Sequence, residues 1–260
     1  MKRIKLTVAY DGGKYSGWQI QPNAPTVEAV LDSAIENVTG EKIHVTGASR
    51  TDAGVHALGN IAVFDTKSSI PGDRWAYALN RYLPNDVSVV DSCEVRPDFH
   101  PRHCDTVKTY EYTILNSEFP IPQLRNAAWH VSHKLDIPAM KKAAEYIVGE
   151  HDFKSFCSVK TQVESTVRTV YSLEVANKTY KEKYDTVILK ITGNGFLYNM
   201  VRIIAGTLVQ VGKGQIEPEY IKEMLEKCDR TAAGQTAPPQ GLTLVNIQYD
   251  ESDYRVNRDI

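Results

Sequence analysis

Hydrophobic and polar residues alternate along the first positions of the chain, which is typical of a half-buried strand. The alternation covers residues 4–8 and stops at Asp11, where two glycines follow. A helical spacing of apolar residues comes next. It predicts a helix that Thr26 caps at its start and Gly40 closes at its end.

The remainder of the first half continues this series of short elements. Its patterns predict strands, then a helix that Pro84 keeps from continuing, then a last strand, over residues 43–46, 61–65, 71–82 and 87–95. The resulting order is β-α-β-β-α-β. This order is typical of a ferredoxin-like unit, also found in RNA-recognition modules.

The second half repeats the order less regularly. Strands are predicted at 107–115, 167–176, 186–192 and 243–249, and helices at 138–148, 198–211 and 218–227. We therefore expect an α+β fold of two ferredoxin-like (βαββαβ) halves. Their antiparallel sheets would join into one extended sheet with helices on one face.

The segment around residues 97–105 is the expected junction, because it contains two prolines between strand patterns. We therefore expect an N-terminal domain over residues 1–104 and a C-terminal domain over residues 105–260. The chain as a whole carries a net charge of −2. This balance argues against a polycation that coats nucleic acid, but it leaves room for a local basic groove.

Composition narrows the class of protein further. With 42% hydrophobic and 24% charged residues the chain is globular, which excludes disordered, collagen-like and coiled-coil proteins. No apolar run is long enough for a membrane span and the N-terminus has no signal-like apolar segment, so we expect a cytoplasmic protein. The four cysteines form no C-x-x-C pair, and we expect them to pack as small thiols.

The segment from Gly47 to Ala57 is the most unusual of the chain. It is rich in small residues, and Arg50 and Asp52 stand two positions apart within it. A carboxylate and a guanidinium at this spacing suit a reactive loop. On the residues alone, a turn with two solvated charges explains the pattern equally well.

Six further segments accompany this one. The motif S-R-T-D-A-G-V-H-A at residues 49–57 resembles the signature of the TruA family of tRNA pseudouridine synthases. Matching segments follow in family order from residue 4 to about residue 249: Y-D-G-G-K-Y-S-G-W-Q at 10–19, D-F-H-P-R at 98–102, K-T-Y-E-Y at 108–112, G-E-H-D-F-K-S-F at 149–156, N-M-V-R-I-I-A-G at 199–206 and Q-G-L-T-L at 240–244. One departure is Glu164, which dilutes the basic character of the family's segment between Phe156 and Arg168.

The resemblance implies an isomerase that converts uridine to pseudouridine in tRNA. Its targets would be at about positions 38 to 40 of the anticodon arm, where a base must leave its stack to be reached. The family needs no cofactor or metal and works as a homodimer. Asp52 matches the family's catalytic carboxylate. Whether this group attacks the sugar, attacks the base or removes a sugar proton stays open.

The resemblance also assigns roles to other residues. Arg50 takes the place of the flipped base, and Tyr110 stacks on the flipped uracil. Leu242 lines the other side of the uracil pocket. Arg202 is the expected ionic partner of Asp52, since a charge in an otherwise apolar helix needs one. The expected RNA contacts are Phe99, His100, Arg102 and Lys160.

Tyr110 and Tyr112 share one face of their strand because side chains alternate along it. That face is either the core or the side that meets RNA, and the residues alone do not decide between them.

Two other classes of protein fit parts of the pattern. A non-catalytic RNA-binding module would use the same sheets and Tyr110. A metal-dependent hydrolase would need His44, His56 and Asp52 to converge, although their spacing matches no metal-binding helix pair. We expect His56 to be a packed or hydrogen-bonded histidine instead.

Overall fold

The computed structural model describes residues 1–158 and 164–255 of the chain. It forms two compact units. The first unit comprises Met1–Thr106 together with the C-terminal segment that begins at Leu244, and the second comprises Val107–Thr243. Both units combine helices with antiparallel strands, which confirms the α+β class.

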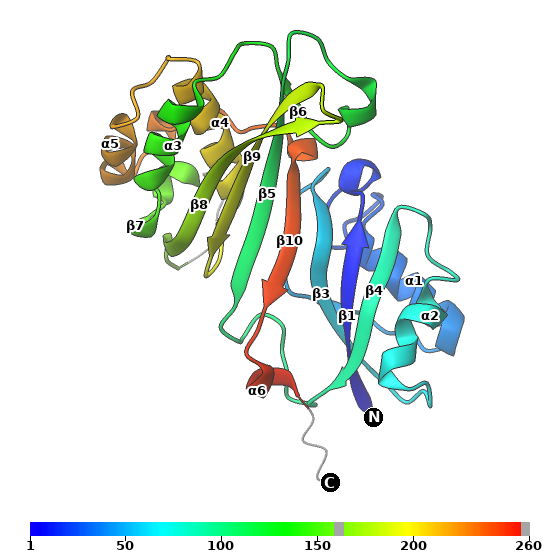
Figure 1. Ribbon diagram of the computed structural model, residues 1–260. Coiled ribbons are helices and arrows are strands. Elements are labelled where there is room, and N and C mark those ends of the chain that lie inside the picture. Colours follow the sequence, from blue (N-terminus) through cyan, green and yellow to red (C-terminus); the bar gives the residue numbers. More distant parts are fainter. Residues whose placement is uncertain (159–163, 256–260) are drawn as a thin grey trace. The chain divides into compact units, whose positions relative to one another are not determined.

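The first unit contains a sheet in the order β4-β1-β3-β10 (Figure 1), and β2 pairs with β3. Strand β1 is antiparallel to both β3 and β4. The elements of this unit are β1 (Lys2–Tyr10), α1 (Val27–Thr39), β2 (Thr46–Gly47), β3 (His56–Thr66), α2 (Trp75–Leu79), β4 (Val87–Val95), β10 (Leu242–Gln248) and α6 (Glu251–Tyr254).

The predicted alternation of β1 is confirmed. Ile4, Leu6 and Val8 are buried, and the residues between them are partly exposed. Phe64 on β3 meets the ring of Trp75 on α2 edge-on, with 4.9 Å between the ring centroids. The core of this unit therefore forms where the apolar sides of β1 and β3 meet the helices.

The strand predicted at residues 43–46 is wrong apart from its last residue, because β2 covers only Thr46–Gly47. A side chain of α1 binds the backbone that would have formed it. Asp32 accepts a hydrogen bond from the backbone N–H of Val45 at 2.9 Å and lies 2.7 Å from Nδ1 of His44.

The predicted side-chain cap of α1 is also wrong. Thr26 precedes the helix, but its buried hydroxyl has no hydrogen-bond partner. The backbone carbonyls of Gly17 and Trp18 accept from the N–H groups of Val27 and Glu28 instead, at 3.3 and 3.0 Å. The polar segment after β1 thus replaces the cap.

The predicted helix over residues 71–82 is shorter than expected. A 3-10 turn at Gly72–Arg74 precedes α2, which ends at Leu79. Asn80 follows, and its side-chain amide donates to the carbonyl of Val89 and accepts from its N–H. This side chain ties the end of the helix to β4.

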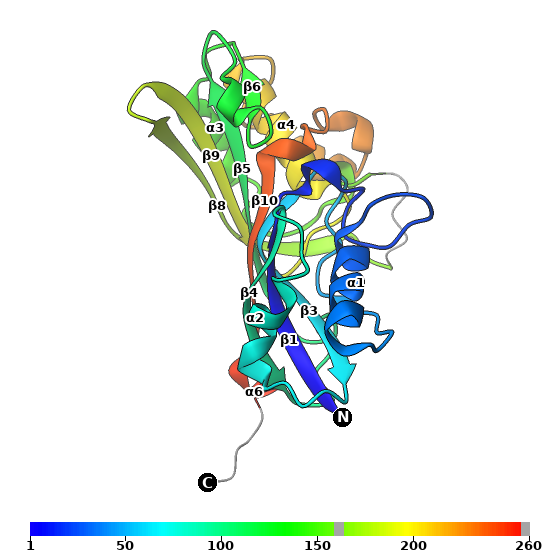
Figure 2. The same cartoon turned by 90° about the vertical axis from the view of Figure 1, so that its right-hand side faces the viewer.

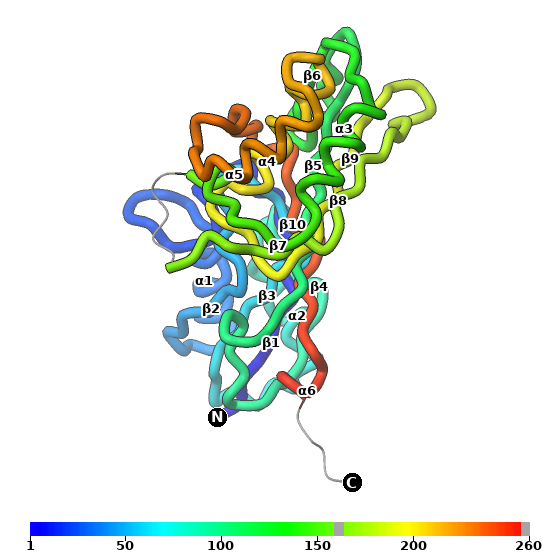
Figure 3. Tube along the Cα trace, turned by 90° about the vertical axis from the view of Figure 1, so that its left-hand side faces the viewer, coloured from blue at the N-terminus to red at the C-terminus, as the bar shows by residue number. Residues whose placement is uncertain are grey.

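The second unit contains strands in the order β5-β9-β8-β7, with β6 parallel to β5. Figure 2 shows its long β8–β9 hairpin, and Figure 3 shows α3, which packs against α4 and β8. The elements are β5 (Val107–Asn116), β6 (Trp129–Val131), α3 (Ile137–Glu145), β7 (Gly149–Asp152), β8 (Val167–Tyr180), β9 (Tyr184–Gly193), α4 (Met200–Gly212) and α5 (Tyr220–Lys227).

The strands β6 and β7 are absent from the sequence-based expectation. Each is too short for an alternating pattern to stand out. Within the described residues, no helix combines the length and apolar character needed to span a membrane.

Candidate active site

The segment Ser49–Val55 connects β2 to β3, and its residues differ in exposure. Ser49 and Thr51 are buried, with 8% and 7% of their surface exposed. Arg50 between them is exposed, and Asp52 is half-buried. Two anchored residues therefore alternate with two charged residues that solvent reaches.

The motif at residues 10–19, called the N-terminal motif below, holds the backbone of the segment that contains Arg50 and Asp52. The N–H of Trp18 donates to the carbonyl of Thr51 at 3.1 Å, and the N–H of Gly54 donates to the carbonyl of Tyr15 at 3.2 Å. Gly12 lies so close to Val55 that a Cβ on it would come within 2.0 Å of the Val55 carbonyl oxygen. Two motifs far apart in the sequence thus form one packed structure.

A tight turn follows Asp52. Its carbonyl accepts from the N–H of Val55 at 3.1 Å, and Gly54 in this turn has a φ of +78°. Glycine adopts this left-handed conformation without steric cost, whereas residues with a Cβ are strained there. Gly54 therefore sets the direction in which the chain leaves Asp52.

His56 is hydrogen-bonded, as expected. Its Nδ1 accepts from the N–H of Gly12 at 3.1 Å and lies 3.1 Å from Asp11. His44 lies beside Asp32 instead. In the part of the chain that the structure describes, no three His, Cys, Asp or Glu residues gather as a metal site would require. The metal-dependent hydrolase finds no support there.

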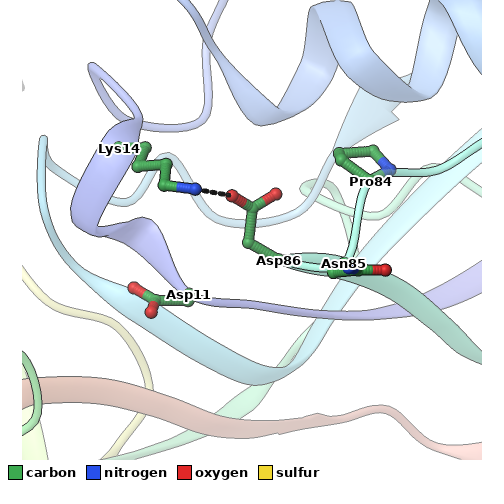
Figure 4. A pocket seen from close by; sticks show the side chains of 5 residues that line it. All are labelled: Asp11, Lys14, Pro84, Asn85 and Asp86. Carbon is green, nitrogen blue, oxygen red and sulfur yellow. Dashed lines mark ion pairs between the residues drawn. The ribbon is translucent and has the colours of Figure 1, made fainter.

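A pocket of about 520 Å³ opens beside the N-terminal motif, lined by Asp11, Lys14, Pro84, Asn85 and Asp86 (Figure 4). Lys14 and Asp86 form an ion pair at 3.3 Å across it. The hydroxyl of Tyr15 donates to Asp86 at 2.6 Å. This hydrogen bond lowers the pKa of Asp86, and Lys14 acts in the same direction. These two contacts of Asp86 stabilise the turn at Lys14 and Tyr15, and the carbonyl of Tyr15 in turn accepts from Gly54.

In the second unit, Tyr110 and Tyr112 are both buried, with 8% and 0% of their surface exposed. The ring of Tyr110 meets Phe196 edge-on at 5.3 Å between centroids. The hydroxyl of Tyr112 donates to the carbonyl of Pro238 at 2.7 Å, and burial raises the pKa of this tyrosine. Tyr112 is therefore a core residue. The role expected of Tyr110 stays a prediction.

Arg202 lies in the first turn of α4 and is half-buried among apolar neighbours. Its Nε donates to the carbonyl of Ala237 and its Nη1 to Oδ1 of Asn199, both at 2.8 Å. The guanidinium is thus held in one orientation by two neutral acceptors. Its pairing with Asp52 stays a prediction.

Leu242 is buried and begins β10. Gly241 precedes it and lies against Tyr112, since a Cβ on this glycine would come within 2.6 Å of the tyrosine ring. The segment before Leu242 is therefore fixed against β5.

The expected RNA contacts differ in exposure. Phe99 is 1% exposed, and its ring meets Tyr249 at 5.2 Å between centroids. His100 stacks on His103 at 3.7 Å, and burial followed by the neighbouring His103 lowers its pKa. Arg102 is exposed, and Lys160 lies outside the described residues. Phe99 is thus a core side chain, its backbone N–H donates to the Arg96 carbonyl and its carbonyl accepts from Arg3. Its expected contact with RNA stays a prediction.

Sequence reasoning missed two residues beside the predicted ones. Phe196 contacts Tyr110, and Asn60 contacts the backbone of Ser49 from inside the first unit. The position of Phe196 between two predicted elements was an available signal, whereas Asn60, directly before the strand predicted at 61–65, had none in the sequence.

The fold and the braced loop define the class as a mixed α+β protein that presents one carboxylate beside an exposed arginine. A family model described as tRNA pseudouridine synthase matches residues 6–103 and 143–250. The tRNA pseudouridine synthase A of Thermoanaerobacter sp. (strain X514) is 49% identical over 249 residues, which cover 96% of this chain and all of the relative. The enzymes of that name from Acetivibrio thermocellus and Brevibacillus brevis are 48% and 49% identical over 250 residues, with the same coverage.

The chain therefore belongs to the tRNA pseudouridine synthase family. The resemblance to the TruA family is confirmed, and the chain is an isomerase that acts on uridine in tRNA. A binding module without catalysis is excluded by this membership.

Proposed function

We propose that this isomerase modifies about positions 38 to 40 of the tRNA anticodon arm, with Asp52 as its reacting carboxylate. The observation that carries the proposal is the placement of Asp52. It follows the buried Thr51, precedes the turn set by Gly54, and is itself half-buried. A carboxylate in this setting is held in position and still reachable by a substrate.

The reaction explains why a single carboxylate is enough. Isomerisation breaks the N1–C1′ bond of uridine and forms a C5–C1′ bond. C5 gives up its proton and N1 gains one, so the product has the same atoms as the substrate. No electron acceptor and no water is consumed. The acid–base pair of glycoside hydrolysis is therefore not required, and Asp52 acts as nucleophile at sugar or base, or as the base for a sugar proton.

Arg50 is the residue we assign to the vacated position in the RNA stack. Its neighbours Ser49 and Thr51 are buried, so the loop directs the guanidinium away from the core. A planar guanidinium can stack in place of a base, which offsets part of the cost of flipping.

Tyr110 and Leu242 are the proposed walls of the uracil pocket, and Arg202 is the proposed partner of Asp52. In the second unit, hydrogen bonds hold Arg202 in one orientation, and Gly241 fixes the segment before Leu242 against Tyr112. These residues are pre-organised, which favours a rigid binding site.

Arg102 and Lys160 are the proposed contacts to RNA phosphates, and Phe99 and His100 are the other proposed contacts to RNA. Following the same resemblance, we propose a cytoplasmic homodimer in which one tRNA contacts both subunits. We also propose that each half is ferredoxin-like, with the two sheets joined into one.

The experiment uses tRNA transcripts labelled with tritium at C5 of uridine, because substitution at C5 releases the label into water. We expect release from transcripts with uridine at these positions, and no release when cytidine replaces all three. A metal chelator should leave the rate unchanged. Continued release from the cytidine-substituted transcript would contradict the proposed target positions.

A further inference from the structure

The side-chain amide of Asn60 is buried and binds the start of the segment Ser49–Val55, which contains Arg50 and Asp52. Asn60, on β3, is 0% exposed, and its side-chain amide binds both the N–H and the carbonyl of Ser49. Its Oδ1 accepts from the N–H of Ser49 at 3.3 Å, and its Nδ2 donates to the carbonyl of Ser49 at 3.0 Å. The same Oδ1 accepts from the N–H of Ile61 at 3.0 Å. One side chain therefore fixes the residue that precedes Arg50.

The contacts continue to the residue that precedes Asp52. Nδ2 of Asn60 donates to the hydroxyl oxygen of Tyr10 at 3.3 Å, and this hydroxyl lies 2.7 Å from Oγ1 of Thr51. An amide nitrogen only donates. The Tyr10 oxygen is thus the acceptor, and its own proton is available to Thr51. The chain of hydrogen bonds runs from Asn60 through Tyr10 to Thr51.

Burial makes this chain selective for one loop conformation. Tyr10 is 5% exposed and Thr51 is 7% exposed, so solvent does not replace a lost partner. A buried polar group without its hydrogen bond is costly, and a network is satisfied only when every member is in place. A displacement of the backbone at Ser49 or of the Thr51 side chain would leave several such groups unpaired.

We propose that Asn60 and Tyr10 are positioning residues for catalysis. Asn60 holds Ser49, which precedes Arg50, and Tyr10 holds Thr51, which precedes Asp52. Both charged side chains are thereby directed toward the substrate. This inference rests on the proposed function of Asp52. Neither residue touches the reacting atoms in this account. Their effect is on the rate, because a displacement of about 1 Å at a reacting group can cost on the order of a hundredfold.

The first test is a double-mutant cycle on the Tyr10–Thr51 hydrogen bond. Tyr10→Phe and Thr51→Val each remove one hydroxyl and keep the volume. We expect each variant to lower the single-turnover rate at saturating enzyme by about ten- to a hundredfold, with the Kd for tRNA unchanged. The double variant should lose little more than Tyr10→Phe alone, because both substitutions remove the Tyr10–Thr51 bond and Tyr10→Phe also removes the acceptor of the Asn60 amide. Thr51→Ser should recover most of the rate that Thr51→Val loses.

The second test replaces the amide of Asn60. Asn60→Asp keeps the shape but removes the Nδ2 donor to Ser49 and Tyr10. The matched control is Asn116→Asp in the second unit, where Asn116 likewise donates to the carbonyls of Val131 and His133 and accepts from the N–H of Leu135. We expect a rate loss per folded molecule for Asn60→Asp alone.

The outcomes separate this inference from the proposed function. If Asp52→Asn were as active as the parent, Asp52 would not be the reacting group and the proposed function itself would fail. If Asp52→Asn is inactive while Tyr10→Phe and Asn60→Asp turn over at the parent rate, only the positioning role is overturned. Losses that merely follow the fraction of unfolded protein, measured by circular dichroism at the assay temperature, would overturn it as well.

Discussion

Arg202 and Ala237 hold each other by two hydrogen bonds of opposite direction. Nε of the arginine donates to the Ala237 carbonyl at 2.8 Å, and the N–H of Ala237 donates to the Arg202 carbonyl at 3.0 Å. The next carbonyl, of Pro238, accepts from Tyr112. The first turn of α4 and the segment that leads to Leu242 are therefore coupled through these contacts.

Arg202→Lys tests this coupling. Lysine keeps the charge but cannot donate from a planar fork to Ala237 and Asn199 together. We expect the free energy of unfolding to fall by about 1–3 kcal/mol, as for a lost hydrogen bond to a charged group, and turnover to fall with it. Denaturant unfolding and single-turnover rates measure the two effects.

The control for this change is Arg125→Lys, since Arg125 also donates to a backbone carbonyl, that of Pro122, but on an exposed turn. Its stability and turnover should stay near those of the parent. Parent-like turnover by Arg202→Lys would show that the guanidinium has no part in the site.

Substitutions at Tyr110 distinguish stacking of its ring on a base from packing of the ring in the core. Tyr110→Phe keeps the ring, its edge contact with Phe196 and most of its capacity to stack on a base. Tyr110→Ala removes them all. We expect Phe to bind tRNA like the parent, and Ala to weaken binding by about 1–3 kcal/mol as measured by filter binding.

Because Tyr110 is 8% exposed, Tyr110→Ala should also lower the melting temperature. Slow turnover by Tyr110→Phe with normal binding would assign the hydroxyl to proton transfer. A Tyr110→Ala variant that unfolds more easily yet keeps full activity per folded molecule would show that the ring belongs to the core alone.

Gly12→Ala probes the contact between the segment at residues 10–19 and the segment that contains Asp52 and Val55. The added Cβ would come within 2.0 Å of the Val55 carbonyl, so the turn after Asp52 must move. We expect a loss of about 1–3 kcal/mol in stability, together with slower turnover. The neighbouring Gly13→Ala is the matched control, because its Cβ would meet only Oδ1 of Asp11 at 3.1 Å. Equal effects of the two substitutions would contradict the account.

The pH dependence of stability contains a small term from His44. The hydrogen bond to Asp32, and then the charge of that carboxylate, raise the pKa of His44 from its ordinary value of 6.5. A raised folded-state pKa stabilises the fold fully below pH 6.5, and this contribution is lost as the pH rises through the folded-state pKa. NMR titration should show the raised pKa in the parent and a value near 6.5 in Asp32→Asn. An unchanged pKa in that variant would rule Asp32 out as the cause.

The regular elements were predictable where one periodic pattern covers a whole element. The alternation in β1 and the boundaries of β4 follow directly from the sequence, because each strand packs one face on a core. The strand predicted at 43–46 failed because a side chain from α1, Asp32, competes for its backbone. No local pattern contains such a contact between distant segments.

The candidate site shows the same division. The Arg50–Asp52 motif and Arg202 stand out in the sequence by their residue types. Asn60 does not, because its proposed role depends on contacts with Ser49 and Tyr10, eleven and fifty positions away. Its partners are known only once β1 and β3 lie side by side.

The role of Asp52 as the reacting carboxylate is tested most directly by the single-turnover rate of pseudouridine formation by Asp52→Asn. The substrate is tRNA labelled with tritium at C5 of uridine. Asparagine keeps the shape and removes the charge. We predict a parent-like Kd for tRNA and a parent-like melting temperature, with a rate lower by several orders of magnitude. Asp73→Asn, which removes the exposed ion pair with Arg74, should keep the parent rate. A rate for Asp52→Asn within about tenfold of the parent would contradict the assignment of Asp52 as the reacting carboxylate.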